Sequence, residues 1–144
     1  MSFDNVSVAN ELVTVLSGLS GMGAAQIGAP ASIGPKVSSY VTMGGQNHTR
    51  KAAGLKQRET RFFCMFAYRV DGAEATAEIM LMTLVDAFVA ALNADLTLNG
   101  TVKALEMDSS TADEPEYQLR AGKEYREYPI IVTVVQQDTY AINP

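Results

Sequence analysis

Two stretches of the chain carry apolar residues at the three- and four-residue spacing of an amphipathic helix. The first covers residues 5–17, where Asp4 or Asn5 can serve as the N-cap. The second follows Asp71, and Glu74 stands three residues further on, as in a capping box. The spacing predicts two apolar stripes that pack on a sheet, namely Val6, Ala9, Leu12, Val13 and Leu16 in the first helix and Ile79, Met82, Val85, Phe88, Val89 and Leu92 in the second.

Other stretches are rich in β-branched and aromatic residues and are bounded by turn residues, as is typical of strands. We expect strands over 36–43, 61–70 and 101–108, and a hairpin that joins 117–119 to 124–137 through Ala121-Gly122. The stretch 61–70 reads RFFCMFAYRV and is dense enough in apolar residues for a central strand buried on both faces. In the last strand Ile130, Val132 and Val134 share one face, with Ile131 and Val135 on the other.

The order of these elements is helix, strands, helix, strands. This order predicts an α+β fold, a mainly antiparallel mixed sheet with two α-helices packed on one face. At 144 residues the chain is long enough to bury a core of its own. We therefore expect a single domain over residues 1–144.

Two segments depart from these regular patterns. Residues 18–35 are rich in glycine and contain no charged residue, so we expect extended chain lying against another surface, with a short strand near 26–28. Residues 44–60 are polar and open with two glycines, which favours a long loop. Loops of that length in small domains are often functional. We expect both segments to reach neighbouring molecules.

Composition and charge narrow the class of protein. Hydrophobic residues make up 47%, and 11 Lys and Arg stand against 16 Asp and Glu, for a net charge of −5. A dedicated DNA-binding protein usually carries the opposite sign. The single cysteine allows no intramolecular disulfide, and the N-terminus lacks the basic and apolar regions of a signal peptide. We therefore expect synthesis in the cytoplasm. The apolar run 79–92 is interrupted by polar residues and is short for a bilayer, so we expect no membrane partner.

Residues that carry out chemistry are scarce. His48, the only histidine, lies in a polar stretch, and Cys64 lies inside the densest apolar strand, so neither has the setting of a metal ligand or a nucleophile. The glycine clusters at 18–23 and 44–54 lack the pattern of a phosphate-binding loop. The acidic run DEPE at 113–116 is explained by solvation. We therefore expect no enzyme, no catalytic or metal site and no cofactor.

One charge cluster stands out. Five of the eleven basic residues fall in a twelve-residue window, Arg50, Lys51, Lys56, Arg58 and Arg61. Such a cluster is either a solvated loop face or a docking surface for an acidic protein, a neighbouring copy or DNA. An acidic chain with a basic arm favours self-association, because each copy offers the arm's complement.

The order of pieces from residue 27 to residue 138 resembles the tail terminator (tail completion) proteins of long-tailed bacteriophages. The resemblance is carried by YVTMGGQNHTRKAAGLKQRETRFFCMFAYRVDGAEATAE, by the turn DLTLNGTV at 95–102 and by YPIIVTV at 128–134. It implies a virion structural protein at the head–tail junction. Such a protein forms a ring, typically of six copies, that stops growth of the tail tube and joins it to the head-side connector. Genomic DNA passes through the lumen of the ring.

Other interpretations stay open at this stage. A head–tail stopper or a tail tube protein has a similar coarse pattern, and the stretch 37–66 can form the long hairpin that tube proteins need. A different class is a small nucleic-acid-binding module that uses the basic cluster. A further one is a ligand-binding domain whose pocket is lined by Tyr40, Tyr68, Tyr117, Tyr125 and Tyr128.

Overall fold

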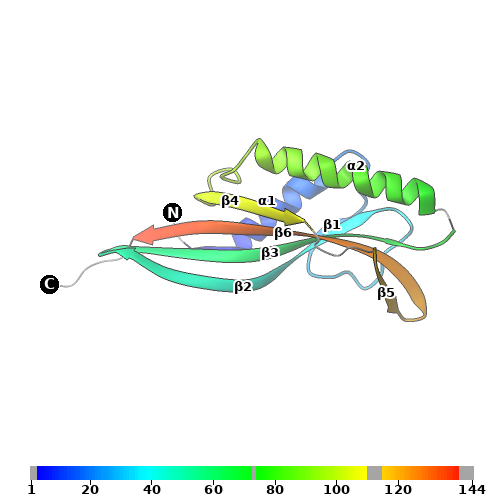
Figure 1. The fold of residues 1–144 in the computed structure, drawn as a ribbon, viewed down its shortest axis with the longest axis horizontal. Helices are drawn as coiled ribbons and strands as arrows, with labels where there is room; N and C mark the ends of the chain where they lie inside the picture. Colours follow the sequence, from blue (N-terminus) through cyan, green and yellow to red (C-terminus); the bar gives the residue numbers. More distant parts are fainter. Residues whose placement is uncertain (1–2, 73, 110–114, 140–144) are drawn as a thin grey trace.

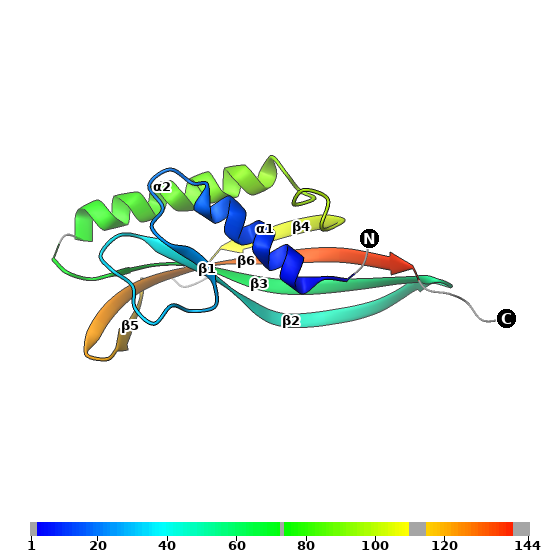
Figure 2. The same cartoon turned by 180° about the vertical axis from the view of Figure 1, so that it is seen from behind.

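Two helices lie on one face of a six-stranded sheet (Figures 1 and 2). The computed structural model describes residues 3–72, 74–109 and 115–139. Its elements, in chain order, are α1 (Asn5–Ser17), β1 (Ala25–Ile27), β2 (Ser38–Ala52), β3 (Leu55–Arg69), α2 (Glu74–Asn93), β4 (Ala104–Ser109), β5 (Glu116–Arg120) and β6 (Lys123–Thr139). The expected α+β fold with a mainly antiparallel mixed sheet is confirmed.

The sheet is built around three long strands. Its order is β1-β2-β3-β6-β4, with β5 paired to β6 beyond the end of β4. Among the strand pairs of the described residues, only β1–β2 is parallel. The turn between β5 and β6 has Ala121 and Gly122 at positive φ, as the expected two-residue hairpin requires. Ile130, Val132 and Val134 of β6 are buried under the helices, as their alternation predicts.

Helix α1 begins where its cap predicts. Asp4 is the N-cap, and its Oδ1 accepts a hydrogen bond of 3.0 Å from the backbone N–H of Ser7. The buried side chains are Val8, Ala9, Leu12 and Leu16. The predicted stripe is wrong at its first position, because Val6 is 67% exposed and Val8 takes its place in the core.

Helix α2 buries a different stripe from the predicted one. It begins at Glu74, with Asp71 in the preceding bend, and its buried residues are Leu81, Leu84, Phe88 and Leu92. Ile79 and Met82 were expected in the core but are 65% and 60% exposed. Apolar residues stand at nearly every position of IMLMTLVDAFVAAL, so two adjacent stripes satisfy helical spacing and the spacing alone cannot choose between them.

By length and composition alone, α2 as a whole (Glu74–Asn93) is long and apolar enough to cross a membrane, although the apolar run 79–92 within it is shorter than a bilayer needs. Core helices of soluble proteins meet that criterion too. Four residues of α2 belong to the core cluster, and the Phe88 ring meets the Phe66 ring of β3 edge-on at 5.6 Å. This packing accounts for the apolar residues of the buried stripe, whereas Ile79 and Met82 on the other side of the helix remain exposed.

The polar segment 44–60 is not a loop. Strand β2 continues to Ala52 and β3 begins at Leu55, so the two strands form one long hairpin with Gly54 at positive φ in its turn. The pairing shifts register between Met43 and Gln46, at the two glycines. The segment is polar because the far end of the hairpin extends past the helices and meets solvent, and its polarity was misread as a loop signal.

Residues 18–35 lie against the chain's own sheet. β1 pairs with the start of β2, close to the expected strand at 26–28. Met22 packs in the core on the helix side, whereas Ile33 packs with Tyr40 in a small cluster on the opposite side. The segment therefore passes around the β2 edge of the sheet, and Met22 and Ile33 are its buried side chains.

Candidate interaction surface on the long hairpin

Strand alternation divides the basic cluster between the two faces of the sheet. Cross-strand partners point to the same face. Arg50 is the partner of Lys56, and His48 is the partner of Arg58, so these residues lie on the helix side. Arg61 is an odd number of positions from Arg58 along β3 and points to the opposite face, which the helices leave uncovered. Lys51 is exposed at the register shift between Arg50 and Ala52, and the other four residues are divided between the two faces.

Arg58 is a structural residue in this arrangement. Its guanidinium Nη2 donates 2.8 Å hydrogen bonds to Asn5 Oδ1 and to Gln136 Oε1, and it lies 4.7 Å from the centre of the Phe3 ring. Gln136 in turn donates to the backbone carbonyl of Thr101. The side chain therefore ties α1, β6 and the N-terminal residues to the hairpin.

Arg58, the hub that joins these elements, is buried, and burial affects both its pKa and its hydrogen bonding. Arg58 is 9% exposed, and burial lowers the pKa of its guanidinium, an effect that Asp4 partly opposes. Its Nε is buried without a hydrogen-bond partner. A buried guanidinium lowers stability unless its other N–H groups are hydrogen-bonded, as Nη2 is here. Arg58 therefore stabilises the fold and is not placed to bind a partner from solution.

Arg61 is the member of the cluster that faces outward on the uncovered face. A Cβ atom at Gly45 would lie 3.0 Å from Arg61 Nη2, so the guanidinium reaches across β2 and lies against the glycine backbone. At Gly44 a Cβ would lie 2.5 Å from the Phe63 ring. The two glycines are needed because side chains of β3 lie over β2 at this point.

A polar hollow of ≈ 550 Å³ surrounds Arg61. It extends over the uncovered face from the glycine bulge of β2 to β4 at the other side of the sheet. Its lining residues are Gly45, Gln46, Asn47, Glu59, Arg61, Asp108 and Thr133. The hollow brings one guanidinium and two carboxylates to one face, an arrangement that the sequence analysis did not foresee because Asp108 is distant in sequence.

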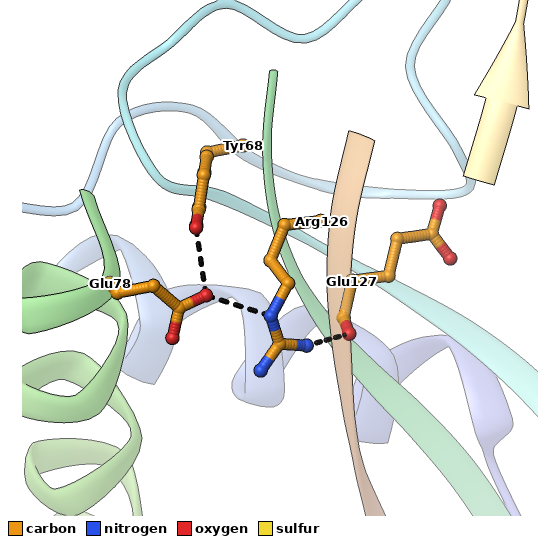
Figure 3. Close-up of polar contacts among 4 residues, drawn as sticks. All are labelled: Tyr68, Glu78, Arg126 and Glu127. Carbon is orange, nitrogen blue, oxygen red and sulfur yellow. Dashed lines mark hydrogen bonds and ion pairs between the residues drawn. The ribbon is translucent and has the colours of Figure 1, made fainter. Parts of the chain in front are cut away.

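A second polar cluster lies at the other end of the sheet, under α2 (Figure 3). Glu78 Oε1 accepts 2.7 Å hydrogen bonds from the Tyr68 hydroxyl and from Arg126 Nε, and Arg126 Nη1 also donates to the Glu127 carbonyl. Burial, and then the bond to Glu78, raises the pKa of Tyr68. The groups satisfy one another, so the cluster fastens α2 to β3 and β6.

The carboxylate of Glu127 points to the opposite face from Arg126. It forms an ion pair of 2.9 Å with Arg120 of β5. Burial raises the pKa of Glu127, an effect that Arg120 partly opposes and that Glu116, its cross-strand partner, reinforces. The pair links β5 to the long strand beside it.

The tyrosines expected to line one pocket lie on both faces of the sheet. Tyr68, Tyr117 and Tyr128 gather on the helix side, the last two with their ring centres about 6 Å from the Arg126 guanidinium. Tyr40 and Tyr125 pack with Ile33 on the other face. These side chains therefore do not converge on a common cavity.

His48 is exposed on β2, where its ring meets the Phe3 ring edge-on, so it is on a strand and not in a loop. Cys64 is fully buried, and burial raises the pKa of its thiol, which makes it the inert apolar residue that its setting predicts. The run 113–116 falls largely outside the described residues. Within the described residues, no group of three or more His, Cys, Asp or Glu side chains is arranged to hold a metal ion.

Comparisons of the chain with protein-family models and with curated proteins found no match.

Proposed function

We propose that the protein is a bacteriophage tail terminator, a virion structural protein that forms a ring, of about six copies by the resemblance noted above. In that role it caps the tail tube, joins it to the head-side connector and lets DNA pass through the lumen. The observation that carries the proposal is the form of the sheet. Three long strands present one face covered by helices and one left open, between two edges of different composition.

Unlike edges are what a ring requires. A ring forms when one surface of a subunit meets a different surface of the next under a rotation that closes. β1 and β2 make one edge of this sheet, and β4 and β5 make the other. A subunit of this kind can meet a neighbour on each side without using the same surface twice.

The uncovered face has the character needed for the wall of a DNA passage. Its acidic side chains are Glu59, Glu106, Asp108, Glu116 and Glu127, and its basic ones are Arg61, Arg69, Arg120 and Lys123, so the two signs nearly balance. Apolar side chains such as Phe63 and Ile131 share this face. A surface of that charge does not grip the phosphate backbone, because affinity for DNA comes chiefly from cationic contacts. Weak contact suits DNA that has to move through the ring.

The long hairpin favours a second candidate, a tail tube protein. Strands β2 and β3 continue well past the helices, and tube proteins need such a hairpin to complete an inner barrel. The two functions differ in how assembly ends. A terminator stops after one ring, whereas a tube protein adds ring upon ring.

The experiment that separates these functions is the measurement of particle mass by light scattering behind a sizing column, with and without tail tube protein. A terminator forms a closed oligomer of about six copies, alone or at the tube end, and its addition fixes the length of growing tubes. A tube protein yields particles whose mass rises without limit with concentration. A monomer that leaves tube growth unchanged would refute both.

A further inference from the structure

We infer that neighbouring copies join edge to edge, with β2 of one copy pairing antiparallel to β4 of the next, and that Arg61 of the first copy forms ion pairs with Glu106 and Asp108 of the second. The inference rests on the ring of the proposed function and specifies its subunit interface. It commits to a second copy of this chain as the partner of both edges.

Both edges are open for most of their length. β1 covers β2 only from Ser39 to Val41, and from Gly45 to Ala52 every residue of β2 is exposed. On the other side of the sheet, β4 pairs with β6 along one side, and its other side meets no strand of the described chain. Open edges offer unpaired N–H and C=O groups to another strand, and they promote uncontrolled association unless something covers them.

Strand direction allows the two edges to pair. β2 is antiparallel to β3, β3 to β6 and β6 to β4, so β4 runs opposite to β2. A rotation about an axis parallel to the strands leaves their directions unchanged. β4 of one copy therefore meets β2 of the next in antiparallel orientation, and the pairing continues the pattern of the sheet.

The two edge strands are electrostatically complementary. β2 contains Arg50 and Lys51 and no acidic residue, whereas β4 contains Glu106 and Asp108 and no basic one. Glu106 shares a cross-strand row with Arg61, through Thr133, so the carboxylates of β4 and the Arg61 guanidinium lie on the same, uncovered face.

The glycine bulge brings Arg61 to the edge. Its guanidinium lies against Gly45, on the β2 side of the sheet, because no side chain at that position blocks it. Glu106 and Asp108 are exposed at the opposite edge. When copies stand side by side, the guanidinium of one is therefore directed toward the carboxylates of the next.

A hollow adjoins each edge, an apolar one beside β2 and one of mixed lining beside β4. The one beside β2, of ≈ 310 Å³, is lined by Val6, Ile27 and Met43 among others, and these three side chains are at least half exposed. The one beside β4, of ≈ 530 Å³, is lined by Val89, Leu105, Met107 and Ile130 together with Asn93 and Glu106. Edge pairing brings the two hollows together and buries apolar surface that a single subunit leaves in water.

The first test uses charge reversal and its rescue. The quantity measured is the midpoint, the protein concentration at which half of the oligomer has dissociated. Arg61→Glu raises this midpoint about tenfold or more, because like charges then face each other across the interface. The combined variant Arg61→Glu, Glu106→Arg, Asp108→Arg restores assembly, since the pairs are re-formed with exchanged signs. Lys123→Glu, at the β5–β6 turn, is the matched control and assembles like the wild type.

Circular dichroism checks that each variant is folded. If Arg61→Glu fails to fold, Glu106→Arg with Asp108→Arg decides the matter, because both side chains are exposed and their reversal weakens assembly equally. Assembly of the charge-reversed variants with wild-type mass and midpoint would overturn the inference.

The second test is a covalent link between the edges. Asn47→Cys with Glu106→Cys places a thiol at each edge on the uncovered face, and the buried Cys64 does not react. A bis-maleimide reagent then gives a ladder of multimers from the assembled protein, whereas Asn47→Cys alone gives nothing beyond a dimer. Rings of wild-type mass without a ladder would refute the edge pairing and leave the terminator function standing. Absence of any ring, with or without tube protein, would refute the terminator function itself.

Discussion

The role of a charged residue in this protein is set by which face of a strand it occupies. Arg58 and Arg61 are three positions apart in one strand, yet the first is a buried hub under the N-terminal residues and the second is directed across the glycine bulge on the open face. A window that counts basic residues treats them as equivalent. Alternation along β3 separates a residue of the fold from a residue of an interface.

Replacing Arg58 with Met is expected to lower the free energy of unfolding by about 2 kcal/mol, because Asn5 Oδ1 and Gln136 Oε1 lose their donor at a buried site. Lys51→Met, at an exposed position of the same hairpin, is the control and changes stability by less than about 0.5 kcal/mol. Urea unfolding followed by circular dichroism measures both. Equal effects of the two substitutions would contradict the hub role of Arg58.

The Asp4 cap makes stability depend on pH in a defined direction. The backbone N–H of Ser7, and then its hydroxyl, lower the pKa of the Asp4 carboxyl below its ordinary value of 3.8. A lowered pKa in the folded state contributes stability above the unfolded value, and this contribution is lost as the pH falls through the folded value. Asp4→Ala should therefore be less stable than the wild type above pH 3.8, with the difference shrinking at lower pH. Urea midpoints across this range provide the measurement, and a difference independent of pH would show that the charge is not involved.

At the scale of elements, local chemistry predicted what a few residues determine by themselves. The Asp4 cap, the Ala121-Gly122 turn and the alternation of Ile130, Val132 and Val134 each require one geometry, and each is found. The buried face of α2 was missed because the choice between Leu81 and Met82 depends on where the sheet lies. The polar half of the hairpin was missed because a strand without a buried face has no apolar alternation to reveal it.

The buried face of α2 can be tested with two matched truncations in one helix. Leu84→Ala removes a fully buried side chain and should cost about 2–4 kcal/mol of unfolding free energy, through lost burial and the cavity left behind. Ile79→Ala removes a side chain that is 65% exposed and should stay within about 0.5 kcal/mol of the wild type. Chemical denaturation of both variants decides between the two stripes, and a larger loss at Ile79 would restore the stripe that the sequence predicts.

At the scale of the whole molecule, the core occupies one end of the long strands and the hairpin tip the other. The core lies where the helices cover the sheet. None of residues 44–57, at the far end of the hairpin, is buried. The tip, with Arg50, Lys51 and Lys56, extends away from the core. A long strand is costly to order without a buried face, so we infer that the tip is retained for contacts between molecules.

A shortened hairpin tests this separation. Thr49 and Gln57 are cross-strand partners, so replacing residues 50–56 with Asn-Gly gives a tight two-residue turn in the same register. The subunit should keep its circular dichroism spectrum and nearly all of its unfolding free energy, because its buried side chains are untouched. The proposed terminator function predicts that cosedimentation of this variant with assembled tail tubes falls by at least about tenfold, since the basic tip is lost. If the variant unfolds, the tip is needed for the stability of the subunit. If it binds tubes as well as the wild type, the docking surface lies in another part of the molecule.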